Sequence, residues 1–135
     1  MLRRSGVTCS DISAYLHTKC ENDGIVVMTE VRVQVRPARF RVPDICLTVG
    51  EPGEEVLTKP PFICIEILSP EDRMSRIEVP INDYLAMGVP YVWVLDPETK
   101  QAFTATAAEG LKEVKTGLLR TENPLFELPL AEAFR

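Results

Sequence analysis

The stretch from Phe62 to Leu68, Phe-Ile-Cys-Ile-Glu-Ile-Leu, constrains the fold of this chain more than any other segment. Its apolar residues do not alternate with polar ones, which predicts a β-strand that is covered on both faces. Glu66 lies inside this strand and is therefore expected to be largely removed from water. Because a buried, ionised carboxylate is costly without a cation or several hydrogen-bond donors, Glu66 indicates a functional site.

A second carboxylate, Asp44, follows Val42-Pro43 at the head of another apolar stretch. Two acidic groups that meet at the ends of strands need a compensating partner, and a divalent metal ion is the simplest one. Each residue also has a structural interpretation. Asp44 could accept hydrogen bonds from backbone N–H groups at the start of its strand, and Glu66 could be a buried acid with an arginine partner.

Length and composition are typical of a single domain spanning residues 1–135, with 45% hydrophobic residues to build a core. No apolar run approaches the length of a membrane span, and Met1-Leu2-Arg3-Arg4 leads into no signal-peptide core. The four cysteines form no CxxC pair, which predicts reduced thiols and no structural zinc. We therefore expect a cytoplasmic protein with no membrane attachment, and no glycine-rich loop indicates an organic cofactor.

The charge of the chain is unevenly distributed. The net charge of −5 argues against tight, sequence-independent attraction to DNA, yet residues 1–41 hold seven Lys or Arg against four acids. Arg36, Arg39 and Arg41 cluster shortly before Asp44. These arginines are either a basic patch beside the proposed site or the solvated tip of a hairpin, and the sequence favours neither.

Local patterns predict a compact α/β unit. Ser69, Pro70 and the acids after them have the pattern of a helix start, and Pro80 is expected to kink or split the helix that follows. Trp93 lies between valines and is expected in the core. The expected elements are a helix capped by Thr8 or Ser10 and ending near Cys20, strands over 25–35, 41–49, 62–68 and 91–95, a helix from Ser69 to Met87, hairpin strands over 101–107 and 111–114, and an edge segment over 125–130.

Three segments carry a resemblance to a known family: Arg41-Val42-Pro43-Asp44, Glu66-Ile67-Leu68-Ser69-Pro70, and the run from Gly88 to Pro97. Together they resemble the Uma-type restriction-endonuclease-like family of bacteria, part of the PD-(D/E)XK nuclease superfamily. The resemblance runs from about Thr29 to Arg135 and implies a restriction-endonuclease-like core with a mixed β-sheet flanked by helices. Family members usually begin further upstream, so this chain is expected to be short at its N-terminus.

The resemblance also implies a chemistry, which is metal-dependent hydrolysis of DNA phosphodiester bonds with Mg²⁺ or Mn²⁺. Asp44 and Glu66 are the expected metal ligands, with the backbone carbonyl of Ile67 as a third. Glu30 resembles the acid that often begins such a site, although it could equally be a surface acid that pairs with an arginine. Endonucleases of this kind usually act as symmetric homodimers, and the apolar tail from Leu125 to Phe134 is a candidate contact.

The chain departs from the family pattern at the lysine that orients the attacking water. The usual position is occupied by Leu68, and the alternative position, four residues before Tyr84, is occupied by Pro80. Arg73 or Arg76 could supply positive charge to the scissile phosphate, but an arginine stays protonated and would not act as a general base. Two hypotheses follow: a metal-dependent endonuclease weakened by the missing lysine, or a catalytically silent nuclease-fold module for binding or assembly.

Overall fold

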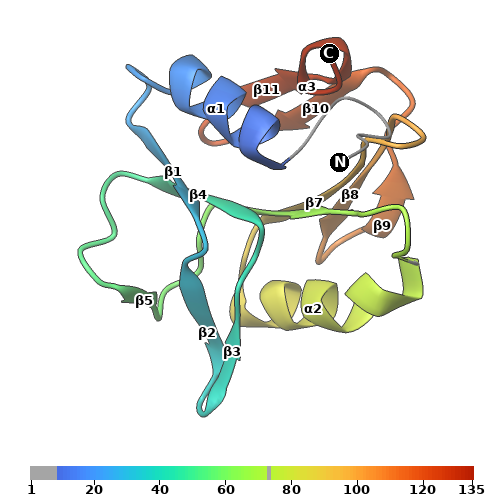
Figure 1. Ribbon diagram of the computed structural model, residues 1–135. Coiled ribbons are helices and arrows are strands. Elements are labelled where there is room, and N and C mark those ends of the chain that lie inside the picture. Colours follow the sequence, from blue (N-terminus) through green and yellow to red (C-terminus); the bar gives the residue numbers. More distant parts are fainter. Residues whose placement is uncertain (1–8, 73) are drawn as a thin grey trace.

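The computed structural model describes residues 9–72 and 74–135. A six-stranded sheet in the order β1-β4-β6-β7-β8-β9 forms its centre, with α2 on one face and α1, β10, β11 and α3 on the other (Figure 1). The elements are α1 (Cys9–Lys19), β1 (Ile25–Thr29), β2 (Arg32–Arg36), β3 (Arg39–Arg41), β4 (Ile45–Val49), β5 (Val56–Leu57), β6 (Ile63–Ile67), α2 (Met74–Met87), β7 (Tyr91–Asp96), β8 (Gln101–Thr106), β9 (Gly110–Glu113), β10 (Leu118–Thr121), β11 (Phe126–Pro129) and α3 (Leu130–Ala133). None of the described helices is long and apolar enough to cross a membrane.

The large sheet is mixed, as predicted. Strands β6 and β7 are parallel and are connected through α2, whereas the other neighbouring pairs in this sheet are antiparallel. Strand β6 is the apolar strand that contains Glu66, and its first four residues, from Ile63 to Glu66, are buried. The sequence therefore identified correctly both a doubly covered central strand and the α/β class of the fold.

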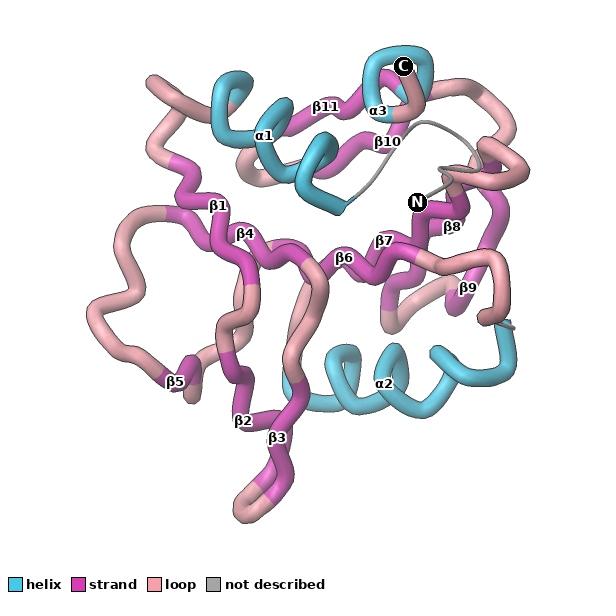
Figure 2. The backbone as a smooth tube through the Cα atoms, viewed as in Figure 1, coloured by secondary structure: helices cyan, strands magenta, loops and turns pink. Residues whose placement is uncertain are grey.

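The predicted strand over residues 25–35 is two strands that belong to different sheets. Figure 2 shows β1 and β4 in the large sheet and β2 and β3 continuing away from it as a hairpin. Thr29 pairs with Ile45, and Val33 pairs with Arg41 in the same antiparallel register. The β1–β4 pair and the β2–β3 pair are therefore two halves of one antiparallel ribbon that is interrupted in the middle. Pro43 cannot donate a ladder hydrogen bond there, and Glu30 has a φ of 58°, which is incompatible with an extended strand.

Helix α2 differs from its prediction at both the start and the middle. It begins at Met74, because Asp72 accepts hydrogen bonds from the backbone N–H and hydroxyl of Ser69 and closes a turn there. The predicted split at Pro80 is wrong, since α2 is continuous from Met74 to Met87. Ile77 and Ile81 are both buried against the same sheet face, and this packing offsets the cost of about 3 kcal/mol that a proline imposes inside a helix.

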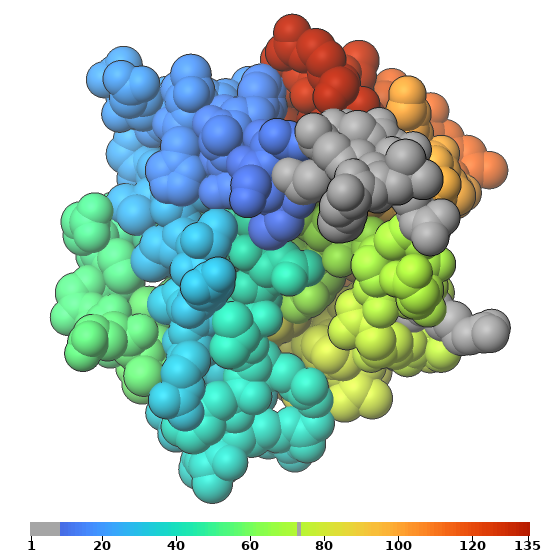
Figure 3. All heavy atoms as spheres, viewed as in Figure 1, coloured from blue at the N-terminus to red at the C-terminus, as the bar shows by residue number. Residues whose placement is uncertain are grey.

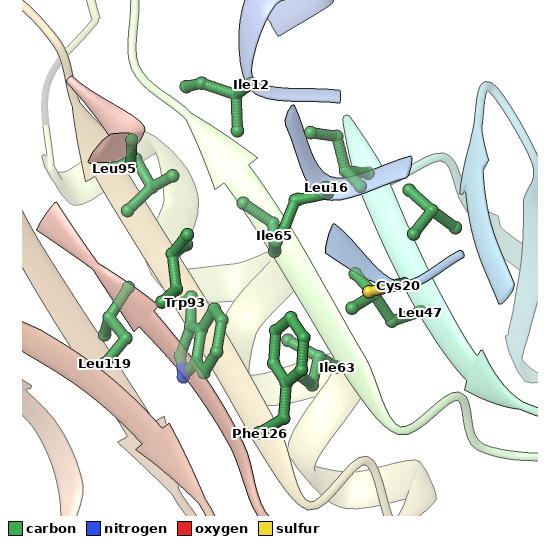
Figure 4. Close-up of a cluster of buried hydrophobic side chains, with 14 of the residues drawn as sticks. Ile12, Leu16, Cys20, Leu47, Ile63, Ile65, Trp93, Leu95, Leu119 and Phe126 are labelled. Atoms are coloured by element: carbon green, nitrogen blue, oxygen red, sulfur yellow. The ribbon is translucent and has the colours of Figure 1, made fainter. Parts of the chain in front are cut away.

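The face of the sheet under α1 carries a large apolar core (Figure 4). Trp93 is fully buried, as predicted, and stacks on Phe126 of β11 with ring centroids 6.2 Å apart. Ile12 and Leu16 of α1 meet Ile65 of the central strand in the same cluster. This core ties the N-terminal helix, the sheet and the C-terminal strands together.

The C-terminal tail packs on its own chain, which corrects the prediction that it offers a hydrophobic surface. Phe126, Leu128 and Phe134 are buried in the core under α1, although Leu125 stays 58% exposed. The segment is an edge strand, as predicted, because among the described residues β11 pairs only with β10 in a separate two-stranded sheet. Strand β10 had no signal in the sequence strong enough to predict it.

Candidate functional site

The two predicted carboxylates lie on one face at one end of the large sheet. Strands β4 and β6 are hydrogen-bonded neighbours in which Ile45 pairs with Ile65. Asp44 immediately precedes β4 and Glu66 follows Ile65, so the register places them opposite one another. Because side chains alternate along a strand, both point to the face opposite that of Ile45 and Ile65, which is the face covered by α2. Their predicted convergence is what the structure shows.

The carboxylate of Asp44 is held by the backbone of the neighbouring strand. Its Oδ2 accepts the N–H of Ile67 at 2.7 Å, which continues the contact between β4 and β6 past the end of the ladder. Burial raises the pKa of Asp44, and the Ile67 N–H and the charge of Arg76 oppose that rise. The structural interpretation, a strand-start acid that accepts a backbone donor, is therefore present, and it fixes the direction in which this carboxylate points.

Glu66 is only 7% exposed and has a neutral hydrogen-bond donor. Its Oε2 accepts the hydroxyl of Tyr84 at 3.0 Å. Burial, followed by the charge of Asp44, raises the pKa of Glu66 to about 7, although the Tyr84 hydroxyl and the charges of Arg76 and Arg41 lower it. The partner of Glu66 is thus a tyrosine and not the arginine that the sequence suggested. A neutral hydroxyl does not balance the negative charge of the carboxylate pair.

One row of residues on α2 faces this pair. Arg76, Pro80 and Tyr84 are spaced four apart and therefore share one side of the helix. The guanidinium of Arg76 pairs with Asp72, with Nε 2.8 Å from Oδ1, and its charge also lowers the pKa of both site carboxyls. Arg73, the other predicted cation, lies outside the described residues.

Sequence reasoning missed Tyr84 as a site residue, although a signal was available. Ile77, Ile81 and Tyr84 recur at helical spacing and form the buried side of α2, so a polar hydroxyl was bound to enter the core beside the strand that carries Glu66. A buried tyrosine usually finds a hydrogen-bond partner, and Glu66 was the buried acceptor that the sequence had already identified.

Glu30 lies near Asp44 but does not complete a close cluster. It is exposed, in the bend between β1 and β2, and lines one open hollow with Cys9, Pro43 and Asp44. Across residues 9–72 and 74–135, no three His, Cys, Asp or Glu side chains gather closely enough to form a metal cage. The Cys9 thiol, which the sequence did not single out, lies 3.9 Å from the backbone carbonyl oxygen of Asp44, and burial and the charges of Asp44, Glu30 and Glu66 raise its pKa.

The three hairpin arginines form a basic cluster that is organised around one acid. Arg36, Arg39 and Arg41 converge on Asp83 of α2, whose side chain is 10% exposed. Arg41 makes the closest contact, with both Nε and Nη2 at 2.8 Å from Oδ2. The sequence could not predict this cluster because Asp83 is far from the hairpin along the chain.

Comparison with known proteins identifies the family. The Uma2 family model, described as "Putative restriction endonuclease", matches residues 3–134. The chain belongs to the Uma2 family. Restriction-endonuclease-like families generally use divalent metal ions, so the family and the paired carboxylates point to the same kind of site.

The fold of this Uma2 chain is similar to a solved structure. A protein from Anabaena variabilis ATCC 29413, titled a putative nuclease belonging to DUF820, superposes with a TM-score of 0.78 and 16% sequence identity. The match covers 99% of this chain and 82% of that one. No curated protein matches the chain. At this identity the likeness supports a nuclease-like fold and does not transfer the roles of individual residues.

The donor set of the Uma2 chain fits a hard divalent cation. Asp44 and Glu66 supply carboxylate oxygens, the donor type that Mg²⁺ and Mn²⁺ prefer. A cation between them would cancel the mutual repulsion that contributes to the raised pKa of Glu66. Only two carboxylates converge, so water and substrate oxygens would have to complete the coordination, as is usual for Mg²⁺.

Proposed function

We propose that this Uma2 protein is a metal-dependent endonuclease that hydrolyses DNA phosphodiester bonds, with Asp44 and Glu66 as its metal ligands. The observation that carries the proposal is the pair itself, in which Glu66 is buried and Asp44 is half-buried. Glu66 has a neutral hydrogen-bond donor, and the charge of Asp44 helps to raise its pKa to about 7. A pair of acids held in this state would bind a divalent cation with little rearrangement, because the two strands already fix both side chains.

The chain's own residues have separate tasks in this proposal. A bound Mg²⁺ or Mn²⁺ would neutralise charge on the phosphate oxygens and lower the pKa of a coordinated water. The Ile67 N–H holds Oδ2 of Asp44, and the Tyr84 hydroxyl holds Oε2 of Glu66, so each carboxylate keeps its orientation. We assign the Ile67 carbonyl as a further ligand, and Glu30 as an acid that approaches from the hollow beside Asp44.

Positive charge for the scissile phosphate would come from arginine. Leu68 is buried and Pro80 lies inside α2, so neither lysine position of the superfamily carries a cation. Arg76 already acts electrostatically on both carboxyls. Arg73, which lies outside the described residues, is the second cation that we assign to the scissile phosphate. Because arginine stays protonated, it would stabilise charge on the phosphate without accepting a proton from water. We therefore expect slow cleavage.

The proposal is tested by nicking of supercoiled plasmid DNA in Mg²⁺ or Mn²⁺. The double variant Asp44→Asn/Glu66→Gln keeps the shapes of both side chains, and we expect it to lose activity by roughly a hundredfold or more. The control Glu113→Gln/Glu127→Gln makes the same change in charge on the distant strands β9 and β11. Equal nicking by all three proteins would overturn the nuclease assignment.

A second function, a nuclease-fold module for binding or assembly, is favoured by Leu68 and Pro80. The row of Arg76, Pro80 and Tyr84 on α2 makes this choice testable. Pro80→Lys would place an ammonium group one turn from Tyr84, and we expect faster metal-dependent nicking if the missing lysine limits catalysis. Val79→Lys is the control, because Val79 is 52% exposed and lies off that row. Unchanged nicking in a folded, metal-binding Pro80→Lys protein would favour the binding module.

Assembly and location complete the proposal. We propose a cytoplasmic homodimer, since two active sites are needed to cut both strands of a duplex symmetrically, and the four free thiols are compatible with a reducing compartment. Phe126, Leu128 and Phe134 of the tail are not available for this contact, because they are buried in the core of their own chain. Light scattering at high micromolar concentration tests this proposal, and a monomer under those conditions would contradict it.

A further inference from the structure

The hairpin of β2 and β3 concentrates positive charge in an otherwise acidic protein. Residues 31–42 contain four arginines and no acid, while the whole chain has a net charge of −5. The hairpin stands out from the body of the molecule on the α2 side (Figure 1), and the space-filling view shows its tip at the lower rim (Figure 3). Positive charge is therefore collected on one projecting element.

Asp83 organises these arginines without neutralising them. One carboxylate faces three guanidinium groups, those of Arg36, Arg39 and Arg41, so the cluster keeps an excess of two positive charges. The fourth arginine, Arg32, is also ordered, with its guanidinium 4.6 Å from the centre of the Phe40 ring. Holding long side chains in place before a ligand arrives reduces the entropy lost on binding.

The three contacts with Asp83 weaken toward the tip of the hairpin. Arg41 lies 2.8 Å from the carboxylate and is 26% exposed, whereas Arg39 lies 3.0 Å away and is 40% exposed. Arg36 lies 3.7 Å away, beyond hydrogen-bond distance, and is 58% exposed. Arg41 therefore anchors the hairpin to α2, and Arg39 and Arg36 present N–H donors to solvent.

The register of the hairpin places the two outer arginines together. The pairing shifts between Gln34 and Arg36, so that Arg36 lies directly opposite Arg39. Without the shift, the regular register would set Val35 opposite Arg39 instead. Two arginines on neighbouring strands can donate to more phosphate oxygens than one isolated cation can.

We infer that this hairpin is the arm through which the protein binds the phosphates of duplex DNA, with Arg36 and Arg39 as the contacting residues. The inference rests on the proposed function for the identity of the partner. Two connections tie the arm to the catalytic end of the sheet. Strand β3 runs through Val42-Pro43 directly into Asp44, and Asp83 is adjacent in α2 to Tyr84, which holds Glu66. DNA on the arm would thus lie beside the carboxylate pair.

The arm also resolves an electrostatic difficulty. A protein with a net charge of −5 repels DNA at long range, so phosphate contacts have to be concentrated where local potential is positive. Arginine suits this task because its planar group can donate two parallel hydrogen bonds to one phosphate.

The test measures binding of a mixed-sequence duplex oligonucleotide in EDTA, where no cleavage occurs, over a range of salt concentrations. We expect Arg36→Ala/Arg39→Ala to bind at least tenfold more weakly at low salt. The slope of log affinity against log salt is negative, and its magnitude should decrease by about two, because each lost phosphate contact removes about 0.9. Arg36→Lys/Arg39→Lys should keep the slope of the original protein, which separates charge from hairpin structure.

The matched control is Lys112→Ala/Arg120→Ala, which removes two exposed cations from the distant strands β9 and β10. If the original protein binds DNA and the arm variant behaves like this control, the arm inference is overturned while the nuclease proposal stands. If the protein binds DNA through Arg36 and Arg39 but never nicks it, the arm is supported and the nuclease proposal fails. Absence of any duplex binding by the original protein would overturn the arm inference.

Discussion

The two faces of the large sheet differ in what they bury. Under α1 lies an apolar cluster that includes Trp93 and Phe126, and under α2 lies a second apolar cluster, rich in valines, on the side that also buries two acids. In the part of the chain that the structure describes, Glu66 and Asp83 are the buried charged residues, and both lie on the α2 side. The α1 face therefore stabilises the fold by apolar burial, and the α2 face holds carboxylates in a poorly hydrated environment.

The difference shows how one sheet can serve two purposes. Burial of apolar surface stabilises the folded state by about 25 cal/mol per Å² and requires no hydrogen-bond or charge partner. Burial of a carboxylate destabilises the charged form, and only a cation, a donor or a proton relieves the cost. Asp83 forms ion pairs with three arginines, whereas Glu66 accepts a hydrogen bond from a neutral tyrosine. The negative charge of the Asp44–Glu66 pair is therefore less well compensated than that of Asp83.

The largest effect on stability is expected on the apolar face. Trp93→Ala should lower the free energy of unfolding by about 4 kcal/mol, because it empties a fully buried site and removes the stack on Phe126. Trp93→Phe should cost only about 1 kcal/mol, since it keeps a ring and removes an indole N–H that has no hydrogen-bond partner within the described part of the chain. Urea unfolding measures both, and equal losses would contradict the packing account.

A smaller effect of opposite sign is expected on the charged face, and it depends on pH. Burial and Asp44 raise the pKa of Glu66 from 4.5 to about 7. The folded state therefore holds this proton more tightly than the unfolded state does, and stability is lost as pH rises from 4.5 through 7. The loss amounts to about 3 kcal/mol at most.

Glu66→Gln cannot ionise and should escape that loss. Its stability relative to the original protein should rise by about 3 kcal/mol between pH 4 and pH 8, as measured by urea unfolding in EDTA. Glu113→Gln, an exposed substitution on β9, should show a difference that does not change with pH. If the stability difference between Glu66→Gln and the original protein were also independent of pH, burial on the α2 face would not destabilise the ionised carboxylate.

The smallest effect is expected at the tip of the arginine hairpin. Ala38 has a φ of 65°, and in the left-handed region a Cβ is unfavourable, so Ala38→Gly should stabilise the protein by roughly 0.5 kcal/mol. Ala14→Gly, on the exposed side of α1, should destabilise it by about 1 kcal/mol. Thermal unfolding of the pair compares one substitution in two backbone environments, and a loss at Ala38 would mean that the hairpin turn is not strained.

The sequence was most informative where the pattern was local. The apolar run around Glu66, the core position of Trp93 and the hairpin strands predicted over 101–107 and 111–114 all follow from side-chain character over a few residues, and the structure confirms them. The convergence of Asp44 with Glu66 could also be predicted, because consecutive strands usually pair.

What the sequence could not supply depends on contacts between distant segments. The antiparallel ribbon of β1–β4 and β2–β3 is interrupted at Glu30 and Pro43 because its two halves belong to different sheets. No local sequence pattern predicts this interruption. Helix α2 stays whole through Pro80 because its flanking isoleucines are buried against the sheet. Asp83 reads as an ordinary helix acid until the fold brings three arginines to it.

The central claim is that the half-buried Asp44 and the buried Glu66 together form a site for a divalent cation, and the titration of Glu66 tests it most directly. Carbon-13 NMR of the glutamate carboxyls, with Glu66→Gln to assign the signal, would follow its pKa with and without Mg²⁺. We predict a pKa of about 7 in EDTA, raised by burial and Asp44, and a clear fall when Mg²⁺ is added. A pKa that Mg²⁺ leaves unchanged at saturating concentration would contradict the claim.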